Sequence, residues 1–250
     1  MIVIGGYTQG GGHSALTPRY GMAADQTLEW EVVSADGKLL RASPTENPDL
    51  YWALSGGGGG TYGVVYSLTS RAYEDSPVSG VNLTFTSAGL TEDVFYSLIG
   101  SWHKRLIPIT DAGCYALTLI TQELFSVFPV LCSGVTLTDL KALMAPFMNE
   151  LSQAGVNFTV DYSEYPSYLA GYTGLIFPTY EGDSIGLSQT GGRLIARSVI
   201  ETDNDALTAV VKNITLDIPL LHVAVKASKM TTGQLDNAVG HFILAYVVHP

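Results

Sequence analysis

The stretch at residues 47–71 reads NPDLYWALSGGGGGTYGVVYSLTSR and decides the fold of the chain around it. Asn47 is a favourable N-cap and Pro48 suits the first helical position, so we predict a short helix that starts here. The helix should end at Ser55, because five consecutive glycines follow. From Thr61 apolar and polar residues alternate, which predicts a strand. The alternation would place three apolar side chains on one face: Val64, Tyr66 and Leu68.

The order helix, glycine loop, strand limits what the glycines could bind. Glycines let a backbone approach a ligand closely and direct N–H groups at it, as a diphosphate requires. In a Rossmann-type dinucleotide fold, however, the loop runs from strand to helix. The opposite order here, and the absence of a G-x-x-x-x-G-K-[ST] motif, disfavour Rossmann and P-loop folds. Taken alone, the loop is equally well explained as a flexible connection between a helix and a strand.

A second glycine-dense stretch, GGYTQGGGHS at residues 5–14, favours a ligand-binding loop over a flexible connection. Two such loops in one short region predict the two walls of a cleft for an extended polar ligand. His13 could hydrogen-bond that ligand or only complete the loop. In the segment that follows, Asp25 is expected to fix the chain by accepting backbone N–H bonds.

Two segments carry a resemblance to a known family: GGYTQGGGHSALTPRYGMAADQTLEWEVVSADG at residues 5–37 and NPDLYWALSGGGGGTYGVV at residues 47–65. They resemble the second half of the flavin domain of FAD-linked oxidases, the berberine-bridge-enzyme-like members of the vanillyl-alcohol-oxidase superfamily, in their fungal form. The resemblance is dense over residues 2–71 and weaker beyond, where it depends on element order and on GGRLIARS at 191–198. It implies FAD as the cofactor, with contacts from both loops and the segment between them: Gly5, Gly6, Gly10, Gly11, Gly12, His13, Ser14, Gly21, Asp25, Gly59, Gly60, Gly63 and Val64.

The resemblance also implies an α+β fold that is truncated at both ends. Residues 1–76 would form the C-terminal part of a PCMH-type FAD-binding domain, ending at the Asp75-Ser76-Pro77 boundary. Residues 77–250 would form a partial substrate-binding domain, an antiparallel sheet with helices on one face. The covalent FAD anchors and the catalytic base of the family would fall outside this sequence, so no catalytic residue is assigned.

Hydrophobic periodicity places the individual elements along the chain. Strands are expected over residues 2–4, 27–33, 38–42, 78–86, 112–122, 124–135, 157–162, 193–200, 216–226 and 240–248, and helices over 91–103, 138–154 and 203–213. Three tyrosines could share one helical face and line a substrate pocket, or only pack against the core: Tyr165, Tyr168 and Tyr172. The five histidines show no metal-ligand spacing, so we expect no metal site.

Composition and charge exclude several classes of partner. The chain has 250 residues, 46% of them hydrophobic, and a net charge of −11. The acidic balance argues against binding to nucleic acid or to an anionic membrane surface. No apolar run is long enough to span a bilayer. The resemblance implies a small-molecule substrate and dioxygen as partners, and we expect a monomer.

The location of the protein is predicted from weaker signals. No signal peptide is present at the start of the sequence, but three glycosylation sequons occur, at Asn82, Asn157 and Asn213. Because the resembling family is commonly secreted, we expect a secreted glycoprotein. Cys114 and Cys132 are expected to be buried free thiols, with a disulfide bridge as the alternative.

Two classes of function remain open on the sequence alone. In the first, the chain is part of an FAD-dependent oxidase that passes hydride from an alcohol, sugar or secondary metabolite to the flavin and then to dioxygen. In the second, it is an inactive truncated fragment or a nucleotide-binding remnant without redox chemistry. Binding of FAD by the chain itself would distinguish them.

Overall fold

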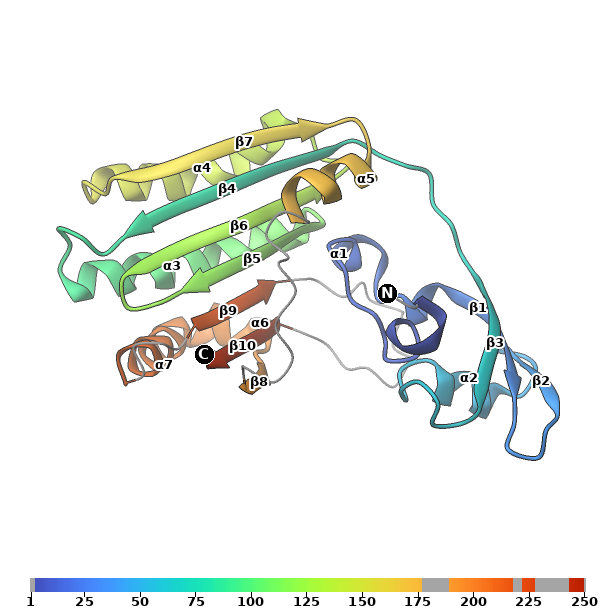
Figure 1. Cartoon of the computed structure of the whole chain (residues 1–250). Coiled ribbons are helices and arrows are strands. Elements are labelled where there is room, and N and C mark those ends of the chain that lie inside the picture. The colour runs from blue at the N-terminus through green and yellow to red at the C-terminus, as the bar shows by residue number, and fades with distance from the viewer. Residues whose placement is uncertain (1–2, 177–188, 218–221, 228–242, 250) are drawn as a thin grey trace. The chain divides into compact units, whose positions relative to one another are not determined.

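A computed structural model describes residues 3–176, 189–217, 222–227 and 243–249 (Figure 1). The chain divides into two compact units between Glu74 and Asp75. Unit 1 contains the described residues up to Glu74, and unit 2 contains those from Asp75 onward. Both units combine helices with an antiparallel sheet, which confirms the predicted α+β class.

Unit 1 contains a three-stranded antiparallel sheet in the order β2-β1-β3. The strand expected at residues 2–4 is wrong, because a single π-helical turn begins at Val3. The two glycines of this turn have no side chains with which to pack in a sheet. The predicted order of helix, glycine loop and strand is confirmed by α2 and β3. The elements of unit 1 are η1 (Val3–Tyr7), α1 (Thr17–Tyr20), η2 (Ala24–Gln26), β1 (Thr27–Val33), β2 (Leu39–Ala42), α2 (Pro48–Leu54) and β3 (Val64–Ser70).

Helix α2 begins and ends where the sequence predicts, but the residue before it does not cap it as expected. Asn47 is in the left-handed region (φ 47°), and its side chain donates to Arg41 O at 2.6 Å instead of capping the helix. The last helical residue, Leu54, is fully buried with Trp30 of β1. This contact packs α2 onto the sheet just before the glycine run.

A bulge in the β1–β3 pairing redirects the side chains of β3. Trp30 of β1 pairs with Leu68, but two residues later in β1 the pairing has moved three residues along β3, to Val65. Val65 and Leu68 therefore both pack on the core of unit 1. The side chains of Val64 and Tyr66 are 70% and 72% exposed. The predicted common face for Val64, Tyr66 and Leu68 is therefore wrong.

Unit 2 is a seven-stranded antiparallel sheet in the order β7-β4-β6-β5-β9-β10-β8, counted over the described residues. Helices α3, α4 and α7 lie against one face, as predicted, and α5 contacts the other face (Figure 1). The elements are β4 (Val78–Thr86), α3 (Glu92–Asp111), β5 (Cys114–Ile120), β6 (Leu124–Ser133), α4 (Leu137–Gln153), β7 (Phe158–Tyr165), α5 (Tyr168–Gly171), η3 (Tyr172–Ile176), β8 (Gln189–Leu194), α6 (Arg197–Thr202), α7 (Asn204–Asp217), β9 (His222–Ala227) and β10 (Ile243–His249).

Aromatic side chains form the centre of the unit 2 core. Phe85, Phe125, Phe147 and Trp102 are all less than 3% exposed. Their rings contact one another at centroid distances of 4.7–6.5 Å. The indole N–H of Trp102 donates to Thr118 Oγ1 at 2.8 Å, so the buried donor is satisfied. These contacts fix α3 and α4 on the sheet.

The strand predicted over residues 193–200 is wrong in its second half. Strand β8 ends at Leu194, and helix α6 begins at Arg197. The guanidinium of Arg197 lies 2.7 Å from Glu201, one helical turn away, and 2.7 Å from Asp111 of α3. An ion pair at this spacing supports a helix and is not formed in a strand.

The two cysteines are joined, so the expectation of free thiols is wrong. Cys114 of β5 and Cys132 of β6 face each other in the strand register and form a disulfide. The pairing depends on the register of two antiparallel strands, which sequence spacing alone does not determine.

Candidate cofactor-binding site

The first glycine loop is a compact turn held by hydrogen bonds of its own chain. The amide of Gly10 donates to Gly6 O at 2.8 Å. Gln9 is only 2% exposed, and its Nε2 donates to Ile4 O at 2.7 Å. The turn is therefore stabilised by the chain itself, without a ligand.

The second glycine loop contacts the first loop directly. The amide of Gly58 donates to the main-chain oxygen of Gln9 at 2.9 Å. A Cβ atom placed on Gly59 would lie 2.1 Å from Gly5 O and 3.3 Å from Gly6 Cα. Only a bare backbone allows this approach. The two loops that the sequence predicts to share a site thus lie against each other within unit 1.

The predicted glycines have different environments. No heavy atom lies within 4 Å of a Cβ placed on Gly6 or on Gly60, so both present open backbone. A Cβ on Gly12 would lie 2.7 Å from the nearest side-chain atoms, and a Cβ on Gly63 would lie 2.7 Å from Val33 O. A ligand could approach the open positions, whereas the crowded glycines are required by packing inside the unit.

The other predicted residues are distributed around the first loop and on β3. Gly21 ends α1 with a φ of 89°. His13 is exposed, and its main-chain oxygen accepts from Tyr7 OH at 2.8 Å. Ser14 Oγ accepts a backbone N–H from two residues further on at 3.1 Å. Val64 begins β3 with an exposed side chain. The FAD contacts of these residues stay a prediction.

The segment between the loops is held by side chains that the sequence reasoning only partly identified. Asp25 Oδ2 accepts from Met22 N at 2.7 Å, which confirms its predicted role. Gln26 was missed: its Nε2 donates to Tyr20 O at 2.5 Å, and its Oε1 accepts from Tyr73 OH at 2.5 Å. The rings of Tyr20 and Tyr73 stack at 3.9 Å. No local motif indicates this contact, since its partners are about fifty residues apart.

The residues of the two loops fit a dinucleotide diphosphate such as that of FAD. Residues 3–14 and 55–63 contain no Asp or Glu, so no carboxylate of the loops would repel the phosphates. Gly6 and Gly60 leave room for a ligand to approach the backbone. Gln9 Oε1 is buried and has no hydrogen-bond partner among the described residues, so one acceptor is available for a ligand donor.

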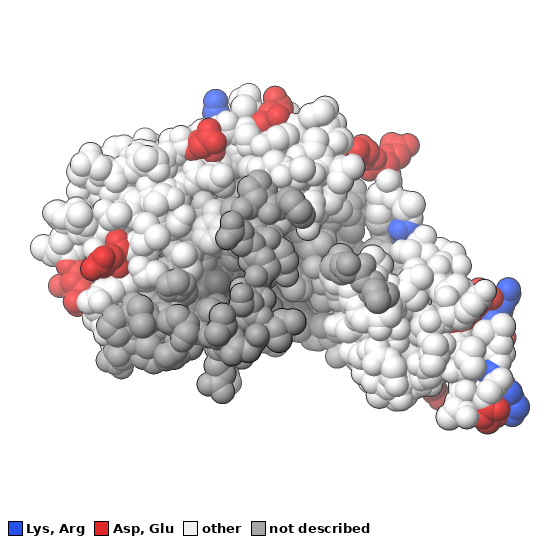
Figure 2. Space-filling model, in the orientation of Figure 1, with Lys and Arg blue, Asp and Glu red and all other residues white. Residues whose placement is uncertain are grey.

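The basic side chains of the β1–β2 hairpin are already paired with acids. Lys38 Nζ lies 2.6 Å from Asp36, and Arg41 lies 3.6 Å from Glu31. Figure 2 shows blue and red side chains next to each other at the lower right of the face drawn. These pairs reduce the positive potential that a nucleic-acid backbone would require.

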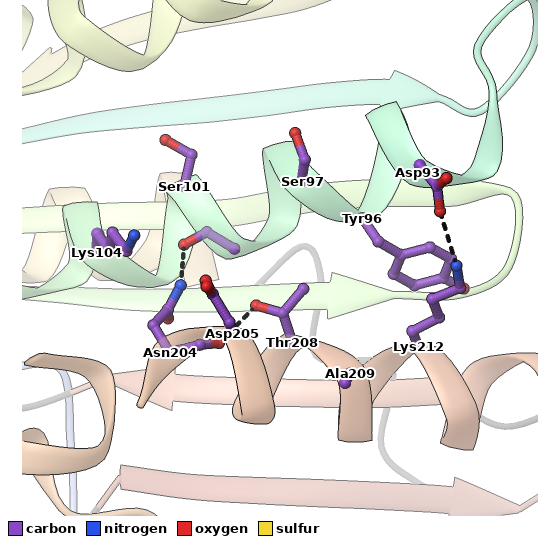
Figure 3. Close-up of a pocket in the computed structure, with 11 residues that line it drawn as sticks. Asp93, Tyr96, Ser97, Ser101, Lys104, Asn204, Asp205, Thr208, Ala209 and Lys212 are labelled. Atoms are coloured by element: carbon purple, nitrogen blue, oxygen red, sulfur yellow. Dashed lines mark hydrogen bonds and ion pairs between the residues drawn. The ribbon is translucent and has the colours of Figure 1, made fainter. Parts of the chain in front are cut away.

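Unit 2 contains a groove of about 390 Å³ between α3 and α7 (Figure 3). At one end Asn204 Nδ2 donates to Gly100 O at 2.9 Å, and at the other Lys212 Nζ lies 3.1 Å from Asp93. A Cβ on Gly100 would lie 2.7 Å from Thr208 Oγ1, so this glycine lets the two helices approach closely. The groove shares no residue with the glycine loops, and we assign it no part in binding FAD.

The tyrosines expected to share one helical face do not do so. Tyr168 and Tyr172 lie on consecutive helical turns with ring centroids 6.3 Å apart, but Tyr165 ends strand β7. The predicted helical face of three tyrosines is therefore wrong.

Across the ranges that the structure describes, no group of three or more His, Cys, Asp or Glu could hold a metal ion. In the same ranges no helix is both long enough and apolar enough to cross a membrane.

Relatives of the chain are flavoproteins. Residues 1–43 match the FAD binding domain family, which confirms the predicted cofactor. The FAD-linked oxidoreductase patO of Aspergillus clavatus is 44% identical over 237 residues, covering 94% of this chain and 41% of that protein. The chain thus spans about two-fifths of the length of the curated relatives it matches.

Solved structures of flavoproteins match the fold of the chain. The VAO-type flavoprotein MtVAO615 from Myceliophthora thermophila C1 matches with a TM-score of 0.79 and 31% identity, over 99% of this chain and 46% of that chain. Berberine bridge enzyme from Eschscholzia californica shares the fold with a TM-score of 0.71 at 18% identity, over 98% of this chain and 50% of that chain. The chain is therefore similar in sequence to FAD-linked oxidoreductases and VAO-type flavoproteins, and it shares the fold of berberine bridge enzyme.

Proposed function

We propose that the protein is a monomeric FAD-dependent oxidase of small alcohols, sugars or secondary metabolites. Bound FAD would accept a hydride from the substrate and pass the electrons to dioxygen. The observation that carries the proposal is the direct contact of the two glycine loops, in which Gly58 N donates to Gln9 O at 2.9 Å. Beside this contact, the open backbone of Gly6 and Gly60 would let the diphosphate approach closely.

Uptake of FAD by the 250-residue chain tests this proposal. We expect the purified chain, mixed with FAD, to keep flavin absorbance after gel filtration. ADP serves as the control ligand, because a nucleotide-binding remnant would bind ADP as tightly as FAD. A chain that binds neither compound, or that does not prefer FAD, would contradict the proposal.

We also propose that the protein enters a secretory compartment. Asn157, ahead of the edge strand β7, and Asn213, on α7, are both exposed. Asn82 lies in β4, between β6 and β7, and its Oδ1 is buried. The Cys114–Cys132 disulfide is compatible with an oxidising environment.

The burial of the three sequons predicts which of them carry glycans. In protein secreted from a eukaryotic host we expect glycans on Asn157 and Asn213 and none on Asn82, because the side-chain oxygen of Asn82 is buried and leaves little room for a glycan. Asn157→Gln and Asn213→Gln should each remove one glycan mass from the intact protein, measured by mass spectrometry. Asn82→Gln should remove none. A glycan on Asn82, or an unmodified secreted protein, would contradict this prediction.

A further inference from the structure

Gln9 lies beside Thr8 in the buried part of the first glycine loop. It is 2% exposed, although glycines follow it and the loop lies at the surface of unit 1. Glutamine is seldom buried this deeply unless its amide is hydrogen-bonded. A buried amide in a loop of bare backbone therefore indicates a specific role.

The hydrogen bonds of Gln9 connect three parts of the chain. Its Nε2 donates to Ile4 O at 2.7 Å, which closes the turn at the start of the chain. Its main-chain oxygen accepts from Gly58 N at 2.9 Å, which ties the second loop to the first. Gly58 and Gly59 have no side chains with which to hold their own position. The arrangement of the second loop thus depends on where the main chain of Gln9 is held.

The Oε1 atom of Gln9 is the part of the side chain that these bonds leave unused. It is buried and has no partner among the described residues, which is unfavourable for an amide oxygen. The bond from Nε2 to Ile4 fixes the amide plane, so the position of Oε1 is fixed as well. A hydroxyl or N–H donor of a bound ligand would satisfy it.

We propose that Gln9 is a positioning residue that holds the two glycine loops in one register for FAD and offers Oε1 to a donor group of the cofactor. The proposal rests on the FAD-binding function proposed above. It assigns to one side chain both the closure of the first loop and the placement of Gly58 in the second. The bare backbone of both loops then remains free for the ligand.

Gln9→Met tests the proposal, because methionine keeps the length and apolar volume but removes both polar atoms. In the 250-residue chain we expect the Gly58 amide to exchange with solvent about tenfold faster, since a weakened hydrogen bond changes local opening by about this factor. FAD affinity, measured by quenching of flavin fluorescence, should fall about tenfold or more. Gln9→Glu keeps an acceptor but places a carboxylate next to Ile4 O, so its effects should be at least as large. If Gln9 only fills space, Gln9→Met will match the original chain in both measurements and the proposal is overturned.

The matched control is Gln122→Met, the same change at an exposed glutamine between β5 and β6. It should alter neither the exchange of Gly58 nor FAD affinity. If the original chain binds FAD and Gln9→Met changes neither measurement, the role of Gln9 fails while the proposed function stands. If the original chain binds no FAD but Gln9→Met still accelerates exchange at Gly58, the proposed function fails and the role of Gln9 in holding the loops is supported.

Discussion

Gly59→Ala is expected to separate the two glycine loops and to weaken FAD binding about 5- to 150-fold. The new Cβ would lie 2.1 Å from Gly5 O, a distance that requires the backbone to move because a carbonyl oxygen cannot rotate away. Overpacking of this kind costs about 1–3 kcal/mol. If the whole cost falls on the arrangement that binds FAD, it corresponds to the stated range in affinity. Titration of FAD against the 250-residue chain and hydrogen exchange at Gly58 measure the two effects.

Gly6→Ala is the matched control for this prediction. No heavy atom lies within 4 Å of a Cβ on Gly6, so the substitution should leave the thermal stability of the chain and the exchange of Gly58 unchanged. Because Gly6 presents open backbone in the proposed site, its alanine variant should weaken FAD binding through direct contact alone. The explanation of Gly59 is wrong if Gly59→Ala binds FAD and protects Gly58 as the original chain does.

These two glycines illustrate what the sequence could predict of the site. Local rules correctly placed α2 and β3 on either side of the glycine run, because capping residues and side-chain alternation act over a few positions. The motif also indicated that the two loops belong together. It did not separate Gly59, which is required by contact with Gly5, from Gly60, which faces open space. That difference depends on backbone segments more than fifty residues apart.

Non-local contacts also explain the other differences. The bulge at Tyr66 shifts the pairing by one residue, so Leu68 faces the core while Val64 does not. The disulfide depends on the register that sets Cys114 opposite Cys132. Strand periodicity describes one strand at a time and contains no information on either pairing.

His103 is expected to make the stability of unit 2 strongly pH-dependent. The side chain lies in α3, is 1% exposed, and has no hydrogen-bond partner for Nδ1 or Nε2 among the described residues. Burial disfavours the charged ring and lowers the pKa of His103 from 6.5 to about 4. The unfolded chain therefore binds the proton first as the pH falls. The contribution to stability is fully present above about pH 6.5 and is lost as the pH falls through about 4.

The gap between the two pKa values corresponds to about 3 kcal/mol in the free energy of unfolding. Between pH 7.5 and pH 4, the free energy of unfolding should fall in both chains, but by about 3 kcal/mol less in His103→Leu than in the original chain. Hydrogen exchange of the α3 amides measures this difference. Leucine has a similar volume and removes two unpaired buried nitrogens, so stability at pH 7.5 should not fall. His13→Gln is the control, because His13 is exposed and lies in unit 1. The carboxylates are the same in all three chains, so they cannot cause a difference between them. If His103→Leu and the original chain lose equal stability on acidification, the buried ring does not cause the acid sensitivity.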